Sequence, residues 1–156
     1  IGGSDSHDPG AAEGPSPIGL PATLVHAPAL SRDAILAALR QGRVVVDVRN
    51  VAGSRLDLWL RDAGGQRTGM GQQLDLPAGQ WATAHAELDY PRPLRIEFVI
   101  DGRRHPATVE TGEDGSQRAS LRWRSDGKRH WLRVDARDGD GSLLMLGNPV
   151  YVNWPR

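Results

Sequence analysis

The stretch Leu94-Arg95-Ile96-Glu97-Phe98-Val99-Ile100 decides the fold class, because it holds the clearest alternation of apolar side chains in the sequence. Leucine, isoleucine and phenylalanine occupy every second position from residue 94 to residue 100. Successive side chains of a β-strand point to opposite faces, so this pattern predicts a strand with one buried face. Asp101-Gly102 follows directly and is a strong signal for a two-residue hairpin turn, which we expect to lead into a strand over residues 106–109.

Alternation of this kind recurs along most of the chain after residue 43. Further strands are expected over residues 56–61, 74–76, 82–88, 119–123, 132–136, 143–146 and 150–154. We expect residues 119–123 to pair with residues 132–136 across Ser125-Asp126-Gly127. About nine short strands, with a turn signal about every ten residues, are typical of a β-sandwich. The sequence therefore predicts a mainly β fold, with an immunoglobulin-like β-sandwich over residues 43–156.

A short helix is expected to precede the sandwich. Ser31 is a favourable N-cap residue, and Gly42 stands where a glycine often ends a helix. Between them, Ile35 and Leu39 belong to an apolar stripe with helical spacing. These signals predict one helix over residues 31–41.

The composition of the chain restricts its function classes. Its 156 residues suit one domain, or one domain with part of another, and the first residue, Ile1, suggests a chain cut from something longer. Nineteen basic and nineteen acidic residues cancel, which argues against nucleic acid as a partner. No apolar run is long enough to span a membrane, and no signal peptide is visible. The lack of cysteine excludes disulfides and fits cytoplasm and periplasm equally.

The segment Gly2-Gly3-Ser4-Asp5-Ser6-His7 carries the most recognisable chemistry. In an extended backbone, Asp5 and His7 would lie on the same face, where a carboxylate oxygen and an imidazole nitrogen can bind one metal or two adjacent metals. By itself, such a segment is also typical of a solvated chain end. The remaining histidines show no ligand spacing and are expected to be ordinary surface or interface residues: His26, His85, His105 and His130.

An ordered set of motifs surrounds this segment. GGSDSH at residues 2–7, IGLPATLV at residues 18–25 and a helix ending in ALRQGR at residues 38–43 are followed by a strand. This order resembles the end of the PHP (polymerase and histidinol phosphatase) domain, and within it the carbaryl-hydrolase-like metallohydrolases. The similarity continues through Met70-Gly71, residues 131–134 and residues 148–152, so it covers nearly the whole chain.

The resemblance implies a metal-dependent phosphoesterase that hydrolyses small phosphate esters or related esters. Its two or three divalent metals (zinc, manganese or iron) would lie at the mouth of a distorted β/α barrel, with a β-sandwich appended. Residues 1–42 would be the end of that barrel, in which Asp5 and His7 match ligand positions. Because the other ligands are absent, we expect this chain alone to bind no metal stably and to be inactive. Its partner would be the missing N-terminal barrel.

Two tryptophans fall out of phase with the buried face of their strands. Trp59 and Trp131 stand beside Arg61 and Arg133, on the outward side of the predicted sandwich. An outward aromatic residue can pack against another domain or form a platform for a sugar. We therefore predict an interface or binding surface at Trp59, Trp131 and Arg133. The alternative to a hydrolase is a non-catalytic module that binds a glycan or a protein.

Overall fold

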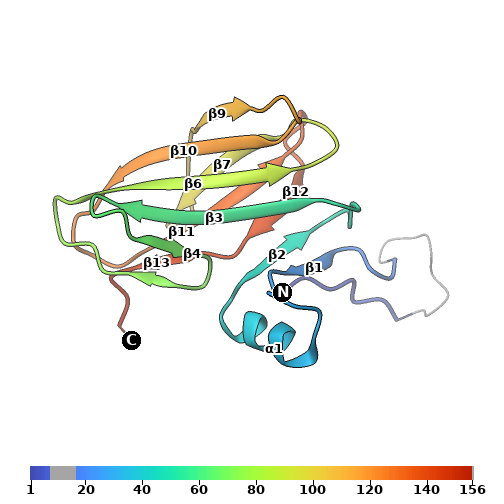
Figure 1. Cartoon of the computed structure of the whole chain (residues 1–156). Helices are drawn as coiled ribbons and strands as arrows, with labels where there is room; N and C mark the ends of the chain where they lie inside the picture. The colour runs from blue at the N-terminus through green and yellow to red at the C-terminus, as the bar shows by residue number, and fades with distance from the viewer. Residues whose placement is uncertain (8–16, 156) are drawn as a thin grey trace.

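The computed structural model describes residues 1–7 and 17–155, which form two β-sheets packed face to face, with a short helix beside them (Figure 1). The larger sheet runs in the order β1 (Ala22–Val25), β2 (Val44–Asp47), β12 (Leu143–Gly147), β11 (His130–Arg137), β13 (Val150–Val152) and β5 (Gln73–Leu74). On this sheet β11 also pairs with β7 (Arg95–Ile100), and β7 with β8 (Arg103–His105). The smaller sheet runs in the order β4 (Arg67–Gly69), β3 (Arg55–Asp62), β6 (Trp81–Asp89), β10 (Gln117–Arg124) and β9 (Thr108–Thr111). The prediction of a mainly β, two-sheet fold is confirmed.

The core lies between the two sheets and is formed by the alternating apolar positions. From the smaller sheet, β3 contributes Leu56, Leu58 and Leu60, each fully buried. From the larger sheet come Ile96 and Phe98 of β7 and Leu132, Val134 and Ala136 of β11. All of these residues belong to one hydrophobic cluster. Burial of this apolar surface is the main force that holds the sheets together.

The helix and the hairpin turn form where the sequence predicts them. The helix α1 (Arg32–Arg40) begins after Ser31, whose hydroxyl accepts a hydrogen bond from the backbone N–H of Ala34. Asp101 and Gly102 have φ angles of 48° and 82°, which two-residue hairpin turns of type I′ require. The strand that directly follows the turn is β8, however, and the predicted strand over residues 106–109 overlaps β9, the next strand along the chain. The turn is so short that pairing with β7 resumes at Arg103.

The predicted hairpin between residues 119–123 and 132–136 is wrong. Strand β10 pairs with β6 and β9 in the smaller sheet, whereas β11 pairs with β7, β12 and β13 in the larger sheet. Residues 125–129 carry the chain across from one sheet to the other. The buried hydroxyl of Ser125 fixes this crossing by donating to the carbonyl of Leu76 at 2.7 Å. Alternation identifies the buried face of each strand, and it leaves the choice of partner open.

Residues before position 43 also join the sheet. Strand β1 pairs with β2, which in turn pairs with β12. The backbone N–H of Gly2 donates to the hydroxyl of Thr23 on β1, and the same hydroxyl donates to the carbonyl of Gly2, both at 2.9 Å. A side chain at Gly2 would stand only 2.7 Å from Cγ1 of Val46. The first residues are therefore held against β1 and β2.

The turn between β4 and β5 fixes the end of the helix to the sandwich. At Gly71, φ is +75° and a Cβ would lie 1.8 Å from the carbonyl oxygen of Gln41, so only glycine fits. The N–H of Gly71 donates to the carbonyl of Pro149 at 2.8 Å, and the side chain of Asn148 donates to the carbonyl of Gly42 at 2.8 Å.

Within the described residues, no helix has the length and apolar character needed to cross a membrane.

Candidate functional site

Asp5 and His7, the predicted metal ligands, lie next to each other in the structure. The carboxylate Oδ1 of Asp5 is 3.6 Å from the imidazole Nε2 of His7. The backbone is not extended here as expected, because Asp5 has a φ of 52°, in the left-handed region that aspartate tolerates better than most residues. This local bend, together with the two-residue spacing, brings the side chains together. Both are almost fully exposed, at 93% for Asp5 and 90% for His7.

The spacing of this pair fits two ligands of one metal ion. Carboxylate oxygens and imidazole nitrogens bind zinc at about 2.0–2.2 Å, so two ligands of a tetrahedral site lie about 3.4 Å apart. A metal site needs more than two protein ligands, and no group of three or more histidine, cysteine, aspartate or glutamate side chains with metal-binding geometry occurs in residues 1–7 and 17–155. Asp5 and His7 thus fit part of a metal site, and the described residues do not complete it.

Trp59 lies on the outer face of the smaller sheet, as its strand phase predicts. Its ring stacks on His85 of the neighbouring strand β6, with centroids 5.4 Å apart and planes 14° from parallel. The guanidinium of Arg67, on β4 at the other side, lies 4.0 Å from the ring centroid. Burial lowers the pKa of His85 below its ordinary value, and Arg61 and Arg67 add to this effect. Neighbours on both flanking strands thus cover much of the indole of Trp59.

Trp131 and Arg133 lie on the outer face of the larger sheet. The phase that places them there is confirmed, since Leu132 and Val134 are buried in the core. Trp131 is half-buried, with the guanidinium of Arg133 5.5 Å from its ring centroid and Tyr151 opposite it on β13. Arg133 also donates from Nε to Asp135 Oδ1 at 2.9 Å. The structure therefore brings Trp131 and Arg133 together, but places Trp59 on the other sheet.

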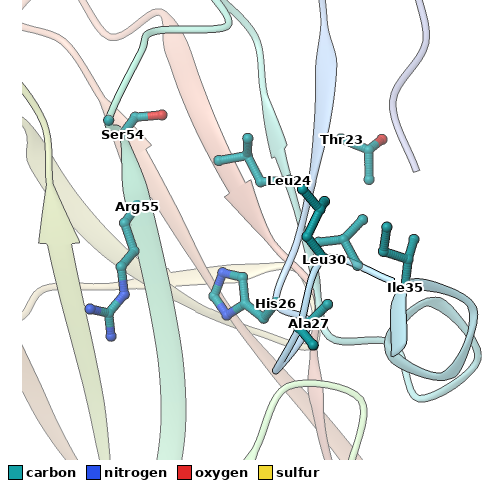
Figure 2. Close-up of a pocket in the computed structure, with 11 residues that line it drawn as sticks. Thr23, Leu24, His26, Ala27, Leu30, Ile35, Ser54 and Arg55 are labelled. Atoms are coloured by element: carbon teal, nitrogen blue, oxygen red, sulfur yellow. The ribbon is translucent and has the colours of Figure 1, made fainter. Parts of the chain in front are cut away.

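A groove that the sequence does not reveal runs along β1. It has a volume of about 690 Å³ and lies between β1, the helix and the start of β3. Figure 2 shows His26 between Arg55 of β3 and apolar side chains on the helix side, among them Leu30 and Ile35. Burial lowers the pKa of His26; Asp57 opposes this effect, whereas Arg55 and Arg43 add to it. His26 was expected to be an ordinary histidine, and no local motif could have placed it in a groove.

His130 joins three parts of the chain that are distant in sequence. Its Nδ1 is 2.5 Å from Oδ2 of Asp101 in the β7–β8 turn, and its Nε2 is 2.8 Å from Oδ1 of Asp126 in the crossing between sheets. Its carbonyl accepts a hydrogen bond from the indole of Trp154 at 2.8 Å. Burial alone would lower the pKa of His130, but the hydrogen bonds with Asp126 and Asp101 outweigh it and raise that pKa. This arrangement suits a structural role, in which His130 holds the β7–β8 turn, the crossing between sheets and the C-terminal residues together.

Comparisons with known proteins add no family to this geometry: no family model matches the chain, and no curated protein matches it. The resemblance to PHP metallohydrolases therefore rests on the motifs of the sequence itself.

Proposed function

We propose that this chain is the C-terminal portion of a PHP-type metal-dependent phosphoesterase. In this proposal, residues 1–42 are the end of the metal-binding barrel, and residues 43–156 form an accessory, immunoglobulin-like sandwich, whose larger sheet β1 extends by pairing with β2. Asp5 and His7 supply two ligands for a divalent metal, either zinc, manganese or iron. The remaining ligands come from the missing barrel, which is the principal partner of this chain. The substrate is a small phosphate ester or a related ester.

The observation that carries this proposal is the position of Asp5 relative to His7. Their side chains are separated by 3.6 Å, close to the spacing of two ligands on one metal, and both face solvent. The segment that holds them is anchored at Gly2 through the hydroxyl of Thr23. A Cβ at Gly3 would meet no atom of the described residues within 4 Å, so the described chain leaves space on that side of the backbone. A second set of ligands can therefore approach the pair.

The residues of this chain have limited roles in the proposed reaction. The imidazole of His7 and the carboxylate of Asp5 would hold the metal, and the carboxylate would offset part of the charge of the cation. When bound, a divalent metal supplies Lewis-acid activation of water for ester hydrolysis. No other described residue is assigned to the chemistry, because none lies with this pair in a potential metal site.

The test is to express the complete open reading frame that encodes this sequence and to assay its product. The substrates are p-nitrophenyl phosphate and bis-p-nitrophenyl phosphate, with manganese, zinc or iron added. We expect metal-dependent turnover, which Asp5→Ala and His7→Ala each reduce at least about 100-fold, since loss of a metal ligand removes the catalytic ion. Both side chains are exposed, so neither change should affect folding.

Glu113→Ala is the matched control, because it removes an exposed carboxylate far from Asp5 in sequence. It should leave turnover unchanged. If Asp5→Ala and His7→Ala keep full activity, or if the complete protein shows no metal-dependent hydrolysis, the proposal fails.

The second candidate is a non-catalytic module that binds a glycan or a protein through Trp59 or Trp131. Of the two tryptophans, Trp131 is the better candidate for the binding residue, because its half-buried indole has Arg133 beside it. The indole of Trp59 is covered by Arg67 and His85. A glycan array with the wild type and Trp131→Ala tests it. Glycan binding that the substitution abolishes would favour the module over the hydrolase.

A further inference from the structure

Three arginines in the described part of the chain are half-buried: Arg43, Arg133 and Arg137. Two of them have carboxylate partners. Arg133 and Arg137 share Asp135, at 2.9 Å and 3.2 Å, and Arg137 also reaches Glu97 at 3.2 Å. Arg43 differs from both, since no carboxylate of residues 1–7 or 17–155 forms an ion pair with it.

The Nε atom of Arg43 is buried and has no hydrogen-bond partner among the described residues. A buried guanidinium N–H without an acceptor is unfavourable, because it loses its hydration and gains nothing in return. Buried polar groups of this kind call for an explanation, and an acceptor supplied by a ligand is one.

Arg43 lines a polar pocket of about 340 Å³ where the start of β2 meets β3 and the β4–β5 turn. Asp57 and Arg67 also line it, and they pair with each other at 3.2 Å. Gln72 accepts a hydrogen bond at Oε1 from the N–H of Gly69, so its amino group is the end left for a ligand. Because Asp57 is paired with Arg67, no negative charge among the residues that line the pocket balances the guanidinium of Arg43. The pocket therefore suits an anionic acceptor.

His26 lines both this polar pocket and the larger groove along β1, so the two spaces meet at this residue. The groove wall is mainly apolar, with Leu24, Leu30 and Ile35 around it (Figure 2). Leu30 is 98% exposed, which leaves its whole side chain available for contact. Burial keeps the pKa of His26 below its ordinary value, so the ring is uncharged near pH 7. It can therefore lie beside either the charged group or the apolar chain of a ligand.

We propose that this composite site binds an organic anion, with a carboxylate or phosphate group on Arg43 and an apolar chain along β1 against Leu24, Leu30 and Ile35. Arginine suits this role, because its planar guanidinium can donate two parallel hydrogen bonds to either group. The site is separate from Asp5 and His7 and does not depend on the hydrolase proposal. It also explains why half-buried Arg43 has no side-chain partner among the described residues.

The experiment is calorimetric titration of the full chain with four probes: octanoate, octyl phosphate, octanol and inorganic phosphate. We expect octanoate or octyl phosphate to bind more tightly than octanol and inorganic phosphate, which each contain only half of the ligand. The preferred head group identifies the oxyanion. Equal affinity for octanol and for both charged probes, or no binding of either charged probe, would overturn the proposal.

Two substitutions and a control locate the site. Arg43→Gln should weaken binding of the charged probe about ten-fold or more, since a charge-assisted hydrogen bond is lost. Leu30→Ser, at an exposed position, should weaken it by up to about ten-fold through loss of apolar contact. Arg40→Gln, on the exposed face of the helix, should have no effect. If Arg43→Gln and Arg40→Gln bind equally well, the anion is not held by Arg43.

A second measurement on the wild type covers the case in which Arg43→Gln fails to fold. Backbone amide resonances are followed by NMR as octanoate or octyl phosphate is added. The largest shifts should fall on His26, Arg43, Gly69 and Gln72, which surround the polar pocket. Shifts confined to another part of the chain would contradict the assignment.

Discussion

Replacing Asp47 with alanine should destabilise the protein strongly. Asp47 is fully buried at the end of β2, and its carboxylate accepts four hydrogen bonds within the loop that leads to β3. The donors are the backbone N–H groups of Arg49, Asn50 and Val51, at 2.9–3.0 Å, and the hydroxyl of Ser54, at 2.6 Å. This one side chain therefore holds the loop that forms a wall of the groove along β1.

The expected loss in free energy of unfolding follows from the number of these hydrogen bonds and from how exposed each one is. A hydrogen bond to a charged group contributes about 1.5–3 kcal/mol, and Arg49 and Asn50 are exposed enough for water to replace the carboxylate. Discounting those two bonds leaves two, which together contribute about 3–6 kcal/mol, and since single substitutions rarely cost more than about 5 kcal/mol, we expect Asp47→Ala to lower the free energy of unfolding by about 3–5 kcal/mol. For a domain of this size, that loss corresponds to a fall in melting temperature of about 6–20 °C.

The assay is chemical and thermal unfolding followed by circular dichroism, for the wild type, Asp47→Ala and Asp47→Asn. Asparagine keeps one acceptor oxygen, so Asp47→Asn should lose less stability than Asp47→Ala but remain less stable than the wild type. Asp62→Ala is the matched control, because the Asp62 side chain accepts one exposed backbone bond, from Gln66 at 2.8 Å, and its loss should stay within about 1 kcal/mol. If Asp47→Ala is no less stable than Asp62→Ala, the carboxylate does not organise the loop as described.

Three further predictions concern activity, pH and packing. The isolated 156-residue chain should show no metal-dependent turnover of p-nitrophenyl phosphate; turnover well above the buffer control would show that it is catalytically complete. Asp126 and Asp101 raise the pKa of folded His130 above 6.5. The stability that these two carboxylates add to the folded protein through protonated His130 is therefore present below pH 6.5 and lost as pH rises through the folded pKa. The stability difference between the wild type and His130→Gln, from urea unfolding at pH 5.5 to 8.5, should therefore shrink as pH rises, and a constant difference would contradict this assignment. Gly71→Ala should lower the melting temperature by about 5 °C or more, since its Cβ would overlap the carbonyl of Gln41, and an unchanged value would mean that the turn can shift.

The alternation of apolar residues made most of the fold predictable. It identified the inward faces of β3, β6, β7 and β11, and with them the burial of Leu132 and Val134 beside the outward Trp131. The helix was predictable because its cap residue, Ser31, lies next to it in sequence. Such signals are local, and they specify which face of an element is buried without specifying what covers it.

Features that depend on long-range contacts were not predictable from the sequence. The partners of β10 and β11 are set by a crossing between sheets, and the sequence around Ser125 also suits a hairpin. The polar pocket beside Arg43 brings together residues from His26, which follows β1, to the β4–β5 turn, so no spacing along the chain marks it. Asp5 and His7 were predicted to lie together, but they do so through the left-handed conformation of Asp5 rather than through an extended backbone.

The most direct test of the hydrolase proposal is whether Asp5 and His7 bind a metal jointly. The imidazole resonances of the five histidines can be followed by NMR as zinc is added to the full chain. We expect weak binding with two protein ligands, and His7 should shift at the lowest zinc concentration. Asp5→Ala should raise that concentration about ten-fold or more while the protein stays folded, since even outer-shell partners of a metal contribute about ten-fold to its affinity. If His7 responds no earlier than His105 or His130, or if Asp5→Ala leaves its titration unchanged, the two side chains are not ligands of a common metal.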